Sequence, residues 1–132
     1  MRSPSKKLLA GVLLAAAPAF AHHSFMAEFD QRMPVTLAGI VKRVEWVNPH
    51  TYFDVDVSDQ SGKTVRWTLE TGSPGALLSH GWKRDTIKIG DYVRVYAYQA
   101  KDKTSLAAAR VVVLSDGRKL FGGQTDDGGP EK

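Results

Sequence analysis

Alternating hydrophobic and polar residues dominate the middle of this chain and predict a β-rich protein. Successive side chains of a strand point to opposite faces, so a period of two predicts half-buried strands rather than helices. The pattern predicts four strands, at residues 50–57, 65–70, 92–98 and 107–114. A longer run of β-forming residues, 35–46, predicts one more strand before these, and Gly39 in its middle indicates a bulge or bend.

One short helix is predicted between the third and fourth strands. Ser73 suits an N-cap, Pro74 suits the first helical position, and an apolar stretch follows before Gly81. This order predicts an all-β fold with one short helix, a five-stranded OB-type barrel with the helix between strands 3 and 4. A small open β-sandwich with one helix is the alternative, because element order alone does not separate the two folds.

The beginning of the chain has the pattern of a Sec-type signal peptide. A basic start precedes an apolar run, residues 8–20, and Ala19-Phe20-Ala21 supplies the Ala-x-Ala cleavage pattern. The apolar run is shorter than the roughly 20 residues that a membrane span requires. We therefore expect cleavage after Ala21, a periplasmic protein, and no membrane insertion after cleavage.

The chain is predicted to divide into four parts. The second part carries Phe25 and Phe29 among acidic residues, and it is either a helical turn or an extended arm packed onto the domain. The last part is rich in glycine and aspartate and poor in apolar residues, which favours disorder. The parts are a signal peptide (1–21), an N-terminal arm with terminal histidines (22–34), an OB-like β-barrel domain (35–114) and a flexible C-terminal tail (115–132).

Composition limits the function classes that this chain fits. Removal of residues 1–21 leaves 111 residues, enough for one compact domain, with 15 Lys and Arg against 14 Asp and Glu. No basic block remains that would favour nucleic acid as a partner. The absence of cysteine excludes disulfides, thiolate metal sites and cysteine nucleophiles, and serine-hydrolase and metalloprotease motifs are missing. These features predict a binding protein rather than an enzyme.

Cleavage after Ala21 would make His22 the first residue of the mature protein and His23 the second. The α-amine and imidazole of a terminal histidine chelate Cu(II), and a distant histidine completes the histidine-brace arrangement. His50, which follows Asn48-Pro49, is the natural third ligand. In a second mode His23 alone completes the site through its amide and imidazole. Copper handling is therefore the first functional hypothesis, and an oxidative copper enzyme is a weaker alternative, because no substrate groove is visible in the sequence.

Other polar residues have simpler explanations. Asp54, Asp56 and Glu70 fall on the polar faces of neighbouring strands and could form a catalytic carboxylate pair, but arginines on adjacent strands would neutralise them as cross-strand ion pairs. His80 follows the predicted helix, where the helix dipole favours a cation. We therefore expect neither catalysis by these carboxylates nor metal binding by His80.

Tyrosine and arginine alternate on the polar faces of three strands and provide a second functional hypothesis. Such a face could hold a small ligand or a periplasmic protein partner, in an interaction module that needs no metal. It could also stack nucleic-acid bases, but export and the near-zero charge of the mature chain argue against that. Cross-strand aromatic pairs that only stabilise the sheet are the simpler explanation. The residues of this face are Tyr52, Arg66, Arg94, Tyr96 and Tyr98.

Several short motifs of this chain, taken in order, resemble a family of small exported bacterial proteins, DUF6152, whose function is uncharacterised. The resemblance covers residues 22 to about 122. It implies export, a single β-rich domain and the pairing of the terminal histidines with the Asn-Pro-His loop, and it implies no activity. The motifs are His22-His23-Ser24-Phe25, Glu28-Phe29-Asp30, Val44-Glu45-Trp46-x-Asn48-Pro49-His50, Gly72-Ser73-Pro74 with Leu77-Leu78, Gly81-Trp82 and Asp116-Gly117-Arg118-Lys119-Leu120-Phe121.

Overall fold

A computed structural model describes residues 25–123 of the chain. The predicted signal peptide, His22 and His23 lie outside the described residues, and so does the end of the predicted tail, residues 124–132. Within the described part, no helix is long and apolar enough to cross a membrane.

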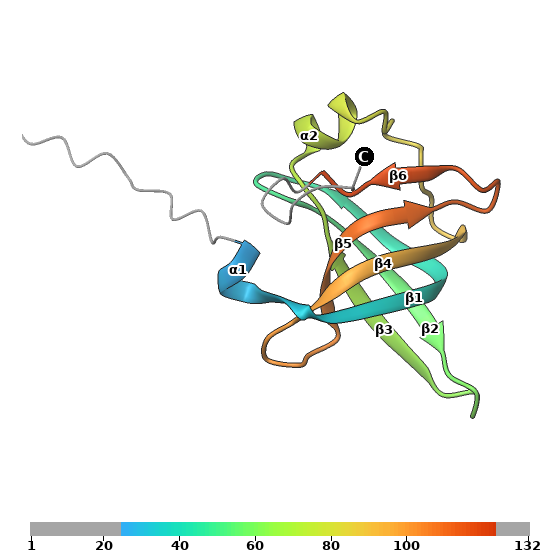
Figure 1. The fold of residues 1–132 in the computed structure, drawn as a ribbon. Helices are drawn as coiled ribbons and strands as arrows, with labels where there is room; N and C mark the ends of the chain where they lie inside the picture. The colour runs from blue at the N-terminus through green and yellow to red at the C-terminus, as the bar shows by residue number, and fades with distance from the viewer. Residues whose placement is uncertain (1–24, 124–132) are drawn as a thin grey trace, which may run out of the picture.

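The described part is mostly β-structure with two short helices, as the alternation predicted (Figure 1). The prediction of five strands is wrong by one, because residues 119–121, placed by the prediction in the tail, form a sixth strand on β5. The elements are α1 (Phe25–Glu28), β1 (Phe29–Trp46), β2 (Thr51–Ser58), β3 (Thr64–Glu70), α2 (Pro74–Ser79), β4 (Tyr92–Ala100), β5 (Leu106–Val113) and β6 (Lys119–Phe121).

The six strands form one sheet in the order β3-β2-β1-β4-β5-β6. Neighbours in this order pair antiparallel, and β3 additionally pairs with β5 in parallel register through Thr68–Leu106, Leu69–Ala107 and Glu70–Ala108. The pairings of β1, β2, β3, β5 and β4 therefore run in a closed ring. Figure 1 shows the strands curving around one another, with α2 at one end and α1 at the side.

The long strand β1 pairs with two neighbouring strands. Its first half, residues 34–40, pairs with β4, and its second half, residues 40–46, pairs with β2. Where β1 changes its partner from β4 to β2, an added Cβ on Gly39 would lie 2.0 Å from the carbonyl oxygen of Asp56. Only glycine therefore permits this close approach of the two backbones. The irregularity in the β1–β2 register falls between Val41 and Arg43, two residues after the predicted position.

Alternating residues of the strands face one continuous apolar core, and the alternation is interrupted where the register shifts in β1 and between β4 and β5. The core side chains come from all five strands of the ring, and α2 and the segment after it close one end with Leu77, Trp82 and Ile87. Burying a large apolar side chain contributes on the order of 2 kcal/mol each, so this cluster is the main stabilising element. The strand residues of the core are Leu37, Val41, Phe53, Val55, Leu69, Val93, Val95, Ala97, Ala107, Ala109 and Val112.

The helix α2 has the predicted start, because the Ser73 hydroxyl accepts a hydrogen bond from the backbone N–H of Ala76 at 3.1 Å. After the helix, buried Trp82 donates its indole N–H to the carbonyl of Phe121 in β6 at 2.8 Å. The backbone N–H of Gly72 likewise donates to the carbonyl of Gly122 at 2.7 Å. The last described residues are thus bonded to the segment around α2.

A second, smaller apolar cluster lies outside the core, where α1 packs on the sheet. The rings of Phe25 and Phe29 are both buried, with centroids 5.4 Å apart, and they pack with Ala100 and Ala108. Phe25 also meets the ring of Tyr98 edge-on at 6.0 Å. Of the two forms predicted for the arm, the chain thus adopts one helical turn at 25–28 and strand from residue 29 onward.

We predict that Gly39→Ala destabilises the protein by at least about 2 kcal/mol, because the new Cβ would collide with the backbone of Asp56. Urea unfolding followed by circular dichroism measures the change. Gly75→Ala is the matched control. Its Cβ meets only the Ser73 hydroxyl at 4.0 Å, and alanine favours the helix, so we expect equal or slightly greater stability. Equal stability of the two variants would show that the β1 crossover tolerates a side chain.

Candidate functional site

His50 lies where the loop after β1 enters β2. Its ring is half-buried, with 29% of the side chain exposed. The ring nitrogen Nδ1 lies 2.9 Å from the carbonyl oxygen of Thr71 and 3.4 Å from Oε1 of Glu70. The ring of Tyr52 stands edge-on to the imidazole at 6.5 Å. His50 is therefore held between the ends of β2 and β3.

Glu70 is a buried carboxylate at the C-terminal end of β3, with 8% of its side chain exposed. In the strand registers it lies opposite Tyr52 on one side and Ala108 on the other, and Ala108 lies opposite Tyr98. These four residues form a row across β2, β3, β5 and β4. Strands are about 4.8 Å apart, so the row spans roughly 14 Å.

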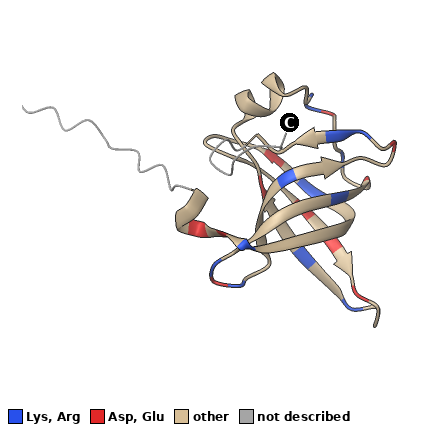
Figure 2. Ribbon diagram, in the orientation of Figure 1, with Lys and Arg blue, Asp and Glu red and all other residues tan. Residues whose placement is uncertain are grey.

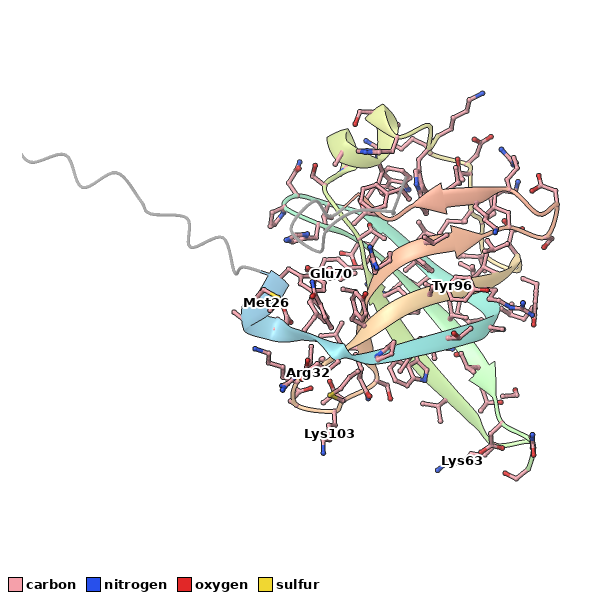
Figure 3. The ribbon with its side chains drawn as sticks, in the orientation of Figure 1. Met26, Arg32, Lys63, Glu70, Tyr96 and Lys103 are labelled. Carbon is pink, nitrogen blue, oxygen red and sulfur yellow. The ribbon has the colours of Figure 1, made fainter. Side chains whose placement is uncertain are left out.

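The helix α1 packs over this row. Phe25 meets the ring of Tyr98, the member of the row on β4, and belongs to the same buried cluster as Ala108, the member on β5. Figure 3 labels Glu70 on the side of the sheet where α1 and Met26 lie. The start of the described chain thus lies at the β4 and β5 end of the row, and Glu70 and Tyr52 follow on β3 and β2.

The surroundings of Tyr52 are electrostatically negative. Burial of the phenol raises the pKa of Tyr52, and the carboxylates of Glu70, Glu28 and Glu45 raise it further. Each of these charges acts on the same hydroxyl, so α1, β1 and β3 all bring a carboxylate toward this region.

Within residues 25–123, no group of three or more His, Cys, Asp and Glu side chains has the arrangement of a metal site. His50 and Glu70 form a pair, and two of the three predicted copper ligands, His22 and His23, lie outside the described residues. The other described histidine, His80, is exposed at the end of α2, with Nδ1 2.7 Å from the carbonyl of Ala76 and its ring against Phe121.

The other two carboxylates weighed for catalysis have structural partners. Asp54 accepts hydrogen bonds from Arg43 at 2.8 and 3.1 Å and from the Thr68 hydroxyl at 2.9 Å. Asp56 accepts a bidentate pair from Arg66 at 2.7 and 3.1 Å. Their neighbours hold the pKa of both carboxyls below its ordinary value, so they stay ionised and fully bonded as ion pairs.

The structure does not gather the predicted tyrosine and arginine face into one surface. Tyr52 belongs to the region around His50 and Glu70, and Arg66 is paired with Asp56 on the β2–β3 hairpin, whose tip is marked by Lys63 in Figure 3. Tyr98 is half-buried beneath Phe25, with its hydroxyl bonded by Arg110 at 2.8 Å.

Two residues of that face, Arg94 and Tyr96, do line a common groove with Tyr92. The groove has a volume of about 480 Å³, and Val113, Ser115 and Lys119 complete its walls. Tyr92 and Tyr96 expose 50% and 44% of their surface. Strands β4, β5 and β6 contain three basic residues and no acidic one, and in Figure 2 they carry blue segments and no red one.

A further groove of about 460 Å³ lies between the start of β4 and the turn that joins β5 to β6. Lysines and aspartates alternate along its walls. Two of its three aspartates already bond protein groups, because Asp91 accepts from the backbone N–H of Lys88 and Asp116 pairs with Arg118.

Sequence reasoning missed three residues that shape these sites. Phe25 was placed in an arm without a defined contact, and Glu70 was weighed only as a catalytic carboxylate, not as a partner of His50. Tyr92 was left out of the tyrosine face. Its position two residues before Arg94, on the same side of the strand, is the signal that could have found it.

The chain is thus a small, mostly β protein with a histidine–carboxylate pair beside its N-terminal helix. The sequence model of DUF6152, a family of unknown function, matches residues 10–108, and the chain belongs to this family. This confirms the resemblance drawn from the motifs. No curated protein and no solved structure matches the chain.

We predict that Asp54→Asn destabilises the protein near neutral pH by about 1 kcal/mol, because Arg43 is half-exposed and water replaces part of the lost interaction. The folded pKa of Asp54 lies below its ordinary value of 3.8, so the stabilisation is present above pH 3.8 and is lost as the pH falls through the folded value. Urea unfolding at pH 7 and pH 3 measures both. A difference between variant and wild type that persists undiminished at low pH would contradict the ionic origin of this effect.

Proposed function

We propose that the mature protein binds Cu(II) at its N-terminus and serves in periplasmic copper handling. The ligands are the α-amine and imidazole of His22, with His50 or His23 completing the site. Three or four nitrogen donors suit Cu(II). The observation that carries the proposal is the packing of α1, because Phe25 fixes the start of the described chain over the row that contains Glu70.

The reach of the N-terminal residues supports a shared site. His22 precedes Phe25 by three residues, and an extended chain covers about 10 Å over that distance. Within the row, Glu70 is one strand spacing from Ala108, which belongs to the same apolar cluster as Phe25, and Tyr52 is two, or roughly 10 Å. His50 adjoins both Glu70 and Tyr52. A metal held by His22 can therefore meet His50 without any change in the sheet.

The charge of the region also supports a cation. Glu70, Glu28 and Glu45 all act on Tyr52, two residues from His50. Negative charge in this region lowers the electrostatic cost of holding a cation near His50. This electrostatic preference supports a site at the sheet rather than a free dipeptide.

The proposal extends to the fold and to the compartment. The ring of pairings, closed by β3 with β5, and the helix between β3 and β4 support an OB-type barrel, whose loops and outer face commonly bind ligands. The signal-peptide pattern of residues 1–21 supports export to the periplasm. We infer that the domain is a binding protein and not an enzyme. Its partner is a periplasmic protein that receives or delivers the metal.

Copper titration of the mature protein, beginning at His22, tests the proposal. We expect one tight equivalent of Cu(II) with a nitrogen-rich EPR spectrum, and an altered spectrum with weaker binding in His50→Ala. An Ala-Ala-Pro extension before His22 removes the terminal amine and places no histidine at the second or third position, so tight binding should disappear.

His80→Ala is the matched control for this titration. It removes the other described histidine, which lies at the end of α2 and contacts Phe121, so copper affinity and spectrum should stay unchanged. Binding that is identical in wild type and His50→Ala would limit the site to the His22-His23 dipeptide. Absence of tight binding in the wild type would reject the copper function.

The groove on β4 supports a second candidate function, the binding of a small organic anion without metal. Arg94 and Lys119 provide positive charge in a groove flanked by the rings of Tyr92 and Tyr96. Its volume of about 480 Å³ lies in the range of small-molecule sites. A carboxylate on the arginine with an apolar ring on a tyrosine matches this lining.

Benzoate and benzamide test the groove, because they share a shape and differ in charge. We expect benzoate, and not benzamide, to shift the backbone NMR signals of β4 around Arg94 and Tyr96, with binding about tenfold weaker in Arg94→Gln. Arg66→Gln is the control, since Arg66 is paired with Asp56 outside the groove. Equal shifts with both compounds would remove this second function.

A further inference from the structure

We propose that His50 binds the metal through Nε2, and that the Thr71 carbonyl and the Glu70 carboxylate are the groups that prepare its ring for this role. The inference rests on the proposed copper function and deepens it. It names the ligating atom and a positioning residue, Glu70, that sequence reasoning did not connect with His50.

The hydrogen bond to Thr71 fixes the tautomer of His50. A carbonyl oxygen only accepts hydrogen bonds, so Nδ1, at 2.9 Å from it, carries the proton. A neutral imidazole has one N–H, and Nε2 is then left with the lone pair that a metal requires. Within residues 25–123, no group hydrogen-bonds this second nitrogen.

Glu70 adds a charge to the same arrangement. Its Oε1 lies 3.4 Å from Nδ1 of His50, so its negative charge stands beside the N–H group that the Thr71 carbonyl accepts. A carboxylate behind a ligating histidine raises the basicity of the nitrogen on the far side of the ring and holds the ring in place. Its burial, with 8% of the side chain exposed, leaves this negative charge weakly screened by water.

His80 provides an internal comparison. Its Nδ1 also contacts a carbonyl, that of Ala76, at 2.7 Å, so its tautomer is fixed in the same way. Among the described residues, however, no carboxylate pairs with His80, and its ring packs on Phe121 at the end of α2. The combination of a fixed tautomer and a buried carboxylate belongs to His50.

Two measurements test this inference. The first is the ¹⁵N NMR spectrum of the histidine ring in the metal-free protein, in which we expect the Nδ1–H tautomer for His50. The second is the Cu(II) affinity of Glu70→Gln, which keeps the shape and an oxygen acceptor but removes the charge. We expect about tenfold weaker binding than in the wild type, with the same tautomer, because the Thr71 carbonyl remains.

Asp56→Asn is the control. It removes one negative charge from β2, but Asp56 lies six residues further along the chain than His50 and is paired with Arg66, so copper affinity should change little. Circular dichroism and thermal melting establish that both variants are folded; if Glu70→Gln is not, the tautomer of the wild type and the EPR change in His50→Ala still decide the ligating atom.

The outcomes separate this inference from the function on which it rests. Absence of tight copper binding in the wild type rejects the proposed function. Tight wild-type binding with an Nε2–H tautomer, or with an unchanged EPR spectrum in His50→Ala, overturns the assignment of Nε2. Tight binding that is equally strong in Glu70→Gln and Asp56→Asn overturns the positioning role of Glu70 alone.

Discussion

The fold depends on one close approach of two backbones, at Gly39. There β1 changes from pairing with β4 to pairing with β2, and its backbone lies against the carbonyl of Asp56 with no room for a Cβ. A side chain at this point would separate the strands. Strands β2 and β4 both pair with β1. Their other neighbours, β3 and β5, pair with each other and close the ring of pairings. The row of residues beneath α1 exists only because of that pairing.

The sequence predicted most of the strands because alternation reports directly on the two faces of a strand. Strand β3, predicted at 65–70, forms at 64–70, and the Ser73-Pro74 pair marked the start of α2. Strand β6 was missed, since three residues carry no measurable period and the strand exists only through pairing with β5. The helix α1 was also undefined, because its stability depends on Ala100 and Ala108, distant in the chain.

The alternation of polar and apolar residues also predicted part of the candidate site. A period of two placed Glu70 and Tyr52 on the outer face, but it does not indicate what covers that face. Glu70 is buried in a row next to α1, which no local pattern reveals. The partner of Asp54 was unpredicted as well. The register irregularity after Val41 brings Arg43 opposite Asp54, and a shift of one residue cannot be inferred from composition.

The hydrogen bond from the Trp82 indole to the Phe121 carbonyl has a consequence for the order of folding. It joins residues 39 positions apart, and its acceptor lies in the last described strand. The pairings of β1 with β4 and of β3 with β5 also join distant segments, and such contacts form slowly. A chain emerging from the ribosome therefore lacks the partners of its core until nearly all of it has been made. A polypeptide that folds late stays unfolded for longer, and an unfolded chain can still be threaded through a narrow channel.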